Sequence, residues 1–139
     1  MKTYEYQHVV AFEETNLLGN VYYVNFLRWQ GRCRELFLRE KAPSILHEIG
    51  RGLRLATVRC SCDYREEIAP FEVVVVRMSL LTLRQTSLTL GFDYVRAGDG
   101  ATVAVGEQEI ACLRDGATGV VAAPVPVELR EALREYERG

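Results

Sequence analysis

The sequence predicts an α+β fold in which one long helix lies against an antiparallel sheet. A proline-free amphipathic stretch follows a short first strand, four runs rich in apolar and β-branched residues follow the helix, and a glycine-rich turn joins two of those runs. The 139 residues suffice for one hydrophobic core and are too few for two ordinary domains, so we expect a single domain over residues 1–139.

The first third of the chain predicts a strand, a loop and the long helix. Tyr4–Phe12 alternates moderately and Glu13–Asn20 is a polar loop. The helix extends from about Tyr22 to Glu40. Its polar side gathers Asn25, Arg28, Arg32, Glu35 and Arg39, and its apolar side gathers Tyr23, Phe26, Leu27, Phe37 and Leu38. We interpret the basic residues of the polar side as a solvated face. A short helical turn at Ser44–Ile49 follows.

The remainder of the chain predicts strands and a final helix. We expect strands at Leu53–Tyr64, Phe71–Leu83, Thr86–Arg96 and Ala101–Leu113. The unbroken apolar run Val73–Val76 indicates a central strand, and the turn Ala97–Gly100 indicates an antiparallel hairpin. A meander is the simplest topology, and a last helix begins near Pro126. A curved sheet wrapped around one helix leaves exposed edges, so we expect pairing with a second copy.

Composition excludes several classes of function. The formal charge of −2 provides no basis for binding nucleic acid, and no apolar run approaches the ~20 residues of a membrane-spanning helix. The N-terminus lacks the apolar core of a signal peptide, so we expect a cytoplasmic protein. Four cysteines without a Cys-x-x-Cys pair and two histidines argue against a metal site. We interpret Cys60 and Cys62 as small core-filling residues.

The polar loop and the helix start form the most specific segment. Asn16 lies four residues before Asn20 and seven before Tyr23, so the loop carries it to the mouth of the helix. Gly19 permits a backbone conformation or a close approach that a Cβ would obstruct. The N–H groups around Tyr22 and Tyr23 are then unpaired donors of the first helical turn, which suits an oxyanion hole. An Asx turn that satisfies nearby backbone is the alternative role for Asn16.

Two polar residues fall inside the apolar sector of the helix. Gln30 and Arg34 both do so, and a buried arginine must be paired, hydrogen-bonded or facing a polar cavity. The cavity interpretation predicts a pocket beside the helix, and pairing with an acidic residue of the sheet is the alternative. Thr57 interrupts an apolar strand and is either an ordinary strand residue or part of a site formed across a dimer. The polar residues Tyr64, Arg65 and Glu67 are interpreted as a solvated rim.

The segment Asn16–Tyr23 resembles the signature of the 4-hydroxybenzoyl-CoA thioesterase branch of hotdog-fold proteins. That pattern is an acidic residue, two spacers, Gly, a polar residue, Val and Tyr-Tyr, and Asn16 stands at its acidic position. Thioesterases of enediyne polyketide biosynthesis also carry Asn there, and Val24–Glu35 is similar to their next segment. The resemblance implies a hotdog fold, with a long central helix wrapped by a curved antiparallel sheet of about five strands. It also implies a dimer or a dimer of dimers.

The resemblance further implies an activity. Enediyne thioesterases hydrolyse a polyene β-ketoacyl thioester from the phosphopantetheine of an acyl carrier protein domain of a polyketide synthase, and the β-keto acid then loses carbon dioxide. No other cofactor is implied. The implied catalytic groups are Asn16, Arg34 and the backbone N–H of Tyr23. We expect Gly19, Asn20, Tyr22, Phe26, Gln30 and Thr57 to bind the substrate.

Two features qualify this expectation. An amide has no useful basicity, so Asn16 cannot act as a general base and is left to orient water or the thioester. Phe26 stands where close relatives often have Tyr, so a hydroxyl is absent there. The alternatives are a general acyl-CoA thioesterase, a non-catalytic acyl-binding partner and a structural oligomeric domain. A hotdog dehydratase is disfavoured because no histidine lies between His8 and His47.

Overall fold

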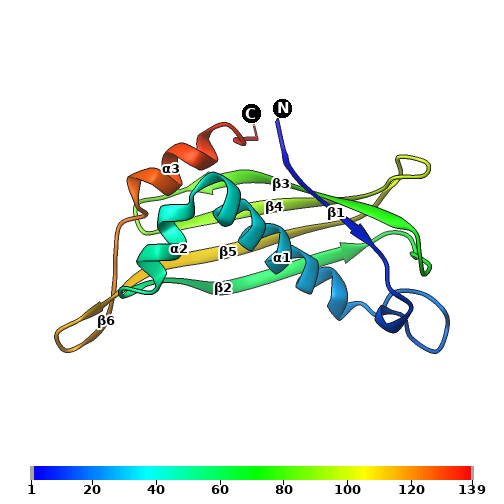
Figure 1. The fold of residues 1–139 in the computed structure, drawn as a ribbon, viewed down its shortest axis with the longest axis horizontal. Helices are drawn as coiled ribbons and strands as arrows, with labels where there is room; N and C mark the ends of the chain where they lie inside the picture. Colours follow the sequence, from blue (N-terminus) through cyan, green and yellow to red (C-terminus); the bar gives the residue numbers. More distant parts are fainter. Residues whose placement is uncertain (1, 139) are drawn as a thin grey trace.

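A computed structural model describes residues 2–138, in which a long helix lies across a curved antiparallel sheet (Figure 1). The elements in chain order are β1 (Tyr4–Val9), the 3₁₀ helix η1 (Phe12–Glu14), α1 (Val24–Lys41), α2 (Pro43–Ile49), β2 (Leu53–Tyr64), β3 (Val73–Leu83), β4 (Ser87–Arg96), β5 (Thr102–Gly116), β6 (Gly119–Ala122) and α3 (Val127–Arg134). The predicted helices and long strands are therefore confirmed to within a few residues. The short strand β6 extends the sheet beyond the predicted five strands.

The sheet order is β1-β3-β4-β5-β2, with β6 pairing β5. The predicted hairpin between β4 and β5 is confirmed, as is the central position of Val73–Val76 in β3, between β1 and β4. The simple meander is wrong for β2, which pairs with β5 over residues Leu53–Tyr64. Because β1 occupies the free edge of β3, β2 finds its partner at the far side of the sheet. This places β2 at an edge.

The helix α1 buries one side against the sheet, with Phe26, Trp29, Cys33, Phe37 and Leu38 almost fully buried. Burying such side chains supplies roughly 1.5–3 kcal/mol each, so this contact fixes where α1 lies. Two assignments from the helical pattern are wrong. Asn25, expected on the polar side, is buried, and Tyr23, expected on the apolar side, is 56% exposed. Because α1 begins at Val24, Tyr23 precedes the helix and turns outward.

Smaller differences also have physical causes. β1 ends at Val9 rather than at the predicted Phe12, because the chain turns into η1. Cys60 is exposed and Cys62 half-buried, so the core-filling interpretation is wrong for Cys60, which lies on the edge strand β2. Among the described residues, no helix is long and apolar enough to cross a membrane.

Candidate functional site

A tight turn positions Asn16 ahead of α1. Its backbone N–H donates to the Asn20 carbonyl at 2.8 Å, and its carbonyl accepts from the Gly19 N–H at 3.0 Å. Gly19 has φ +83°, so the prediction of a conformation that favours glycine is confirmed. The Asn16 Oδ1 accepts from the Leu18 N–H at 2.8 Å, so the Asx turn given as the alternative role for Asn16 is present. The Nδ2 group, by contrast, meets no acceptor within residues 2–138 and remains a free donor.

The start of α1 leaves two backbone donors free. The Tyr22 N–H donates to the Glu14 carbonyl at 2.9 Å, and the Asn25 N–H donates to the Tyr22 carbonyl at 3.0 Å. Within the described chain, the N–H groups of Tyr23 and Val24 meet no acceptor. These are the orphan donors expected at a helix N-terminus, where the helix dipole also favours negative charge. The free N–H groups are thus those of Tyr23 and Val24, one residue later than the expected donors at Tyr22 and Tyr23.

Glu14 joins the loop to both neighbouring elements. Its Oε1 accepts from the Ala11 N–H at 2.8 Å and lies 2.7 Å from His8 Nε2, while its Oε2 accepts from Trp29 Nε1 at 2.9 Å. Its carbonyl accepts from Asn25 Nδ2 at 2.8 Å. Burial raises the pKa of this carboxyl, but the hydrogen bonds from Ala11, His8 and Trp29 outweigh burial and hold the pKa below its usual value. Glu14 therefore sets the loop against α1.

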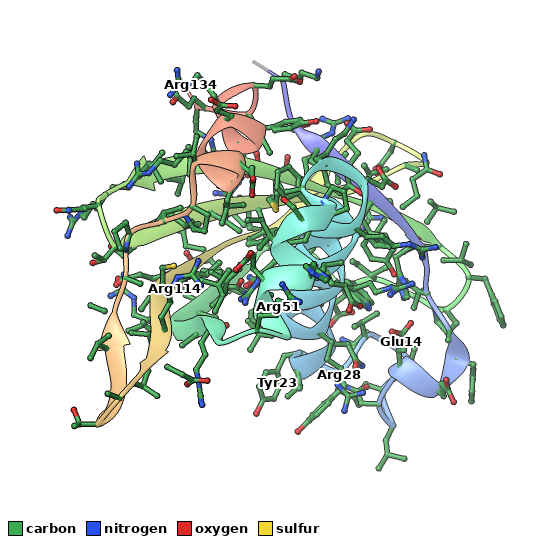
Figure 2. The ribbon with its side chains drawn as sticks, turned by 60° about the vertical axis from the view of Figure 1, so that its left-hand side comes forward. Glu14, Tyr23, Arg28, Arg51, Arg114 and Arg134 are labelled. Atoms are coloured by element: carbon green, nitrogen blue, oxygen red, sulfur yellow. The ribbon has the colours of Figure 1, made fainter. Side chains whose placement is uncertain are left out.

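His8 is held in turn by Tyr6, whose hydroxyl lies 2.7 Å from His8 Nδ1. In the neutral tautomer with a proton on Nε2, the Tyr6 hydroxyl donates to Nδ1 and Nε2 donates to Glu14. Figure 2 shows Glu14, Tyr23 and Arg28 at the end of the molecule where α1 begins.

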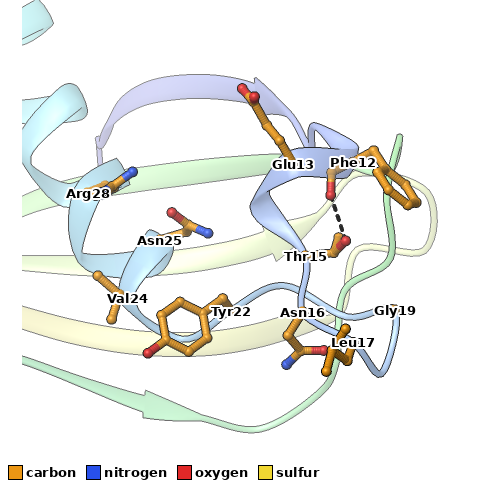
Figure 3. Close-up of a pocket in the computed structure, with 10 residues that line it drawn as sticks. All are labelled: Phe12, Glu13, Thr15, Asn16, Leu17, Gly19, Tyr22, Val24, Asn25 and Arg28. Atoms are coloured by element: carbon orange, nitrogen blue, oxygen red, sulfur yellow. Dashed lines mark hydrogen bonds between the residues drawn. The ribbon is translucent and has the colours of Figure 1, made fainter.

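Two hollows meet at Asn16. The first is an open depression of ≈ 800 Å³, and Figure 3 shows the residues that line it, among them Asn16, Tyr22, Asn25 and Arg28. Its complete lining is Phe12, Glu13, Thr15, Asn16, Leu17, Gly19, Tyr22, Val24, Asn25 and Arg28. The second, of ≈ 230 Å³, is lined by Asn16, Asn20, Val21, Tyr23, Phe26, Tyr64, Glu66, Glu67 and Ile68. Asn16 is the one residue common to the two linings.

Tyr64 closes one side of the second hollow. Its hydroxyl donates to the Tyr23 carbonyl at 2.9 Å, and its ring meets Phe26 edge-on at 4.9 Å. Burial, and then Cys62, raise the pKa of Tyr64 to about 12, so it remains a neutral donor near pH 7. Phe26 is 3% exposed and also packs against Tyr94 at 5.3 Å. The resulting wall is aromatic.

Arg34 lies farther along α1 and is satisfied by neutral partners. Its Nη1 donates to Thr57 Oγ1 and to Gln108 Oε1, each at 2.9 Å, and its Nη2 donates to the Leu55 carbonyl at 2.8 Å. No carboxylate of the described residues lies within 4.0 Å of it, so pairing with an acidic residue of the sheet is not observed. Burial lowers the pKa of Arg34.

A small apolar cavity of ≈ 20 Å³ adjoins Arg34. It is lined by Arg34, Phe37, Leu38, Leu55, Leu88, Leu90, Ile110, Leu129 and Leu133. This cavity is not the polar pocket that the cavity interpretation predicts, because its lining is apolar apart from Arg34; of the three expected situations, Arg34 is in the hydrogen-bonded one.

Gln30 is fully buried between these regions. Its Nε2 donates to the Ser61 carbonyl at 2.9 Å, and its Oε1 has no partner within residues 2–138. A Cβ on Gly106 would collide with the Gln30 amide and with the Ser61 carbonyl, so the close approach of these groups requires glycine there. Gln30 lines neither hollow beside Asn16.

The structure thus groups the residues named from the sequence into two sets. Asn16, Gly19, Asn20, Tyr22, Tyr23 and Phe26 surround the hollows at the start of α1. Arg34 and Thr57 lie together elsewhere, bonded to each other. Arg34 is eleven residues beyond Tyr23, or about 16 Å along a helix axis. One copy of the chain does not bring the two sets together.

Sequence reasoning missed Glu14 and Gln108. The signal for Glu14 was its place three residues after Ala11 and two before Asn16, at the end of a polar run. Gln108 is 5% exposed on a strand whose alternation is otherwise apolar on that face, which marks a buried polar group that needs a partner. No sequence pattern paired it with Arg34.

Comparison with known proteins connects this geometry to a chemistry. The family model of the thioesterase-like superfamily matches residues 10–133. A crystal structure of the dynemicin thioesterase superposes with a TM-score of 0.96 at 43% sequence identity, covering 99% of each chain. A thioesterase superfamily protein from Jannaschia sp. CCS1 is 26% identical, with a TM-score of 0.79 over 93% of this chain and 79% of its own.

A more distant structure confirms the fold. A mutant of 4-hydroxybenzoyl-CoA thioesterase in complex with 4-hydroxybenzoyl-CoA has a TM-score of 0.83 at 18% identity, covering 96% of this chain and 98% of its own. The expected hotdog fold is therefore confirmed. This similarity agrees with the turn at Asn16 and with the free N–H donors at the start of α1. The chain belongs to the thioesterase-like superfamily of hotdog proteins.

Proposed function

We propose that this protein hydrolyses a polyene β-ketoacyl thioester carried by the acyl carrier protein domain of an enediyne polyketide synthase. Its membership of the thioesterase superfamily supports thioester hydrolysis. The 43% identity to the dynemicin thioesterase, whose crystal structures concern polyene binding, supports the substrate class. The observation that carries the mechanism is that Asn16 lines one hollow with Tyr23 and the other with Val24, and that the Asn16 Nδ2 and the N–H groups of Tyr23 and Val24 meet no acceptor within residues 2–138.

These donors suit the charge that develops during hydrolysis. Water attacks the thioester carbonyl carbon and gives up a proton, and the carbonyl oxygen becomes negative. The C–S bond then breaks as a proton passes to the departing sulfur, which releases the thiol and the acid. The backbone donors at the start of α1 stabilise that oxygen. Because the Asn16 Oδ1 is held by the Leu18 N–H, its Nδ2 adds a further donor to the carbonyl oxygen. The β-keto acid that is released then loses carbon dioxide.

Three carboxylates line the hollows, and we propose that none of them is the catalytic base. Glu66 is 3.1 Å from Arg96 and engaged there. Glu13 and Glu67 are exposed, so neither lies in the buried surroundings that tune a carboxyl for proton transfer near pH 7. Hydrolysis then relies on positioning and on stabilisation of charge, which predicts a modest turnover.

We propose a dimer in which the two sets of residues complete one site. β2 is an edge strand, and Val58 is 60% exposed on it. If two copies of β2 pair antiparallel about a twofold axis, the Thr57 end of one lies beside the Tyr64 end of the other. Arg34 is bonded to Thr57, and Tyr64 is bonded to Tyr23. Such pairing brings Arg34 of one copy toward the start of α1 in the other, where it can bind the β-keto oxygen.

The test is product release from a β-ketoacyl carrier protein, followed by mass spectrometry, for the wild type, Asn16→Ala and Arg34→Ala. Turnover by the wild type and its loss in both variants, with unchanged circular dichroism, supports the proposal. No turnover by the wild type contradicts it and favours a non-catalytic acyl-binding role. Equal turnover of the matching CoA thioester favours a general acyl-CoA thioesterase.

A further inference from the structure

The two hollows beside Asn16 differ in charge. Arg28 and Glu13 are the charged residues that line the first. Neither side chain makes a hydrogen bond or an ion pair with any residue of the described chain. The second is lined by Glu66 and Glu67 and by no basic residue. A negatively charged phosphate is therefore repelled from the second hollow, while the first offers an unengaged guanidinium.

We propose that the first hollow binds the phosphopantetheine arm of the substrate, with its phosphate at Arg28. This inference rests on the proposed thioesterase function and adds the direction in which the substrate lies. The thioester stands at Asn16, the residue common to both hollows, so the acyl chain leaves through the second. The aromatic wall of Phe26 and Tyr64 suits an apolar polyene.

The volume of the first hollow and the length of the phosphopantetheine arm agree with this placement. The first hollow, at ≈ 800 Å³, lies within the range of roughly 300–1,000 Å³ common for small-molecule sites. Arg28 is five residues after Tyr23, or about 7.5 Å along α1. The arm has more than a dozen bonds between sulfur and phosphate, so it spans this distance with slack. The amide side chain of Asn25 also faces the hollow, although its Nδ2 is engaged by Glu14.

Arg28 differs from the other arginines nearby. Arg32, one turn later on the same helix, is bonded to Glu35 at 2.8 Å and lines neither hollow. Arg96 is surrounded by Glu66, Glu72 and Asp99. An arginine without a carboxylate partner keeps its full set of donors for a phosphate, which it binds through paired N–H groups. Arg32 is thus a matched control.

The test compares two substrates that differ only in the phosphate. They are the 4′-phosphopantetheine thioester and the pantetheine thioester of one β-ketoacyl group, and the measured quantity is the ratio of their kcat/KM values. We expect the wild type to prefer the phosphorylated substrate and Arg28→Ala to lower the ratio about three- to fivefold, the scale of one exposed charge contact. Arg32→Ala keeps the wild-type ratio. Glu13→Gln raises it, because a repelling charge is removed.

The outcomes separate this site from the proposed function. An unchanged ratio in Arg28→Ala, or an equal fall in Arg32→Ala, overturns the phosphate site while leaving thioester hydrolysis in place. Failure of the wild type to hydrolyse either substrate or the carrier-bound thioester overturns both proposals. Ionic strength provides a further check. Added salt screens the attraction between Arg28 and the phosphate, so the wild-type ratio of kcat/KM values falls toward that of Arg28→Ala as ionic strength rises.

Discussion

The indole N–H of Trp29 donates to Glu14 Oε2 at 2.9 Å, and this bond ties the loop that carries Asn16 to the helix α1. Trp29 is 2% exposed, so the carboxylate is anchored at the edge of the core. The carbonyl of the same Glu14 holds the Tyr22 N–H. Glu14 thus holds the chain two residues before Asn16 and one residue before the free N–H of Tyr23.

Glu14→Gln tests this anchoring. The glutamine amide has one oxygen for the three donors of Ala11, His8 and Trp29, so we expect a loss of about 1–3 kcal/mol in the free energy of unfolding. Urea denaturation measures it. A variant as stable as the wild type would show that the three bonds contribute little.

The same substitution has a pH dependence. The pKa of Glu14 is lowered in the folded protein, so its contribution to stability is present above the unfolded pKa of about 4.3 and is lost as pH falls through the folded pKa. The difference in unfolding free energy between wild type and Glu14→Gln should therefore be constant near neutral pH and shrink below about pH 4. A difference that grows in acid contradicts this assignment.

Much of this loop was predictable from sequence, and its anchor was not. The glycine, the amide and the helix start are local features, which sequence spacing describes well. Glu14 acts through His8 on β1 and Trp29 on α1, which are contacts made only in three dimensions. The position of β2 was mispredicted for the same reason, since strand order depends on which edges are already occupied.

Gly106→Ala tests the close approach between Gln30 and β2. The new methyl group collides with the Gln30 amide and the Ser61 carbonyl, so we expect a loss of about 1–3 kcal/mol in the free energy of unfolding. Gln30→Ala removes one of the two collisions, so the double variant should lose less than the sum of the single losses. Thermal or urea denaturation of the four proteins measures this, and strict additivity would mean that the two positions do not interact.

Arg34→Lys separates the effect of the positive charge of Arg34 from the effect of its hydrogen-bond geometry. A lysine keeps the positive charge but cannot bond Thr57, Gln108 and the Leu55 carbonyl together, so a buried acceptor is left without a donor. We expect a loss of about 1–3 kcal/mol in stability and a fall in kcat. Arg34→Met, which removes the charge as well, should be the less active of the two. Equal activity of Lys and Met variants would show that the charge has no role in turnover.

The most direct test of hydrolysis without a carboxylate base compares Asn16→Ala with Glu67→Gln on a β-ketoacyl carrier protein. Removing one preorganised donor to the oxyanion should lower kcat by about 100-fold or more, so we expect that loss in Asn16→Ala. Within residues 2–138, Glu67 is the carboxylate of the second hollow that makes no ion pair, and Glu67→Gln should retain kcat within about threefold if, as we propose, Glu67 transfers no proton. A large loss in Glu67→Gln with near-normal turnover in Asn16→Ala would contradict the proposed mechanism.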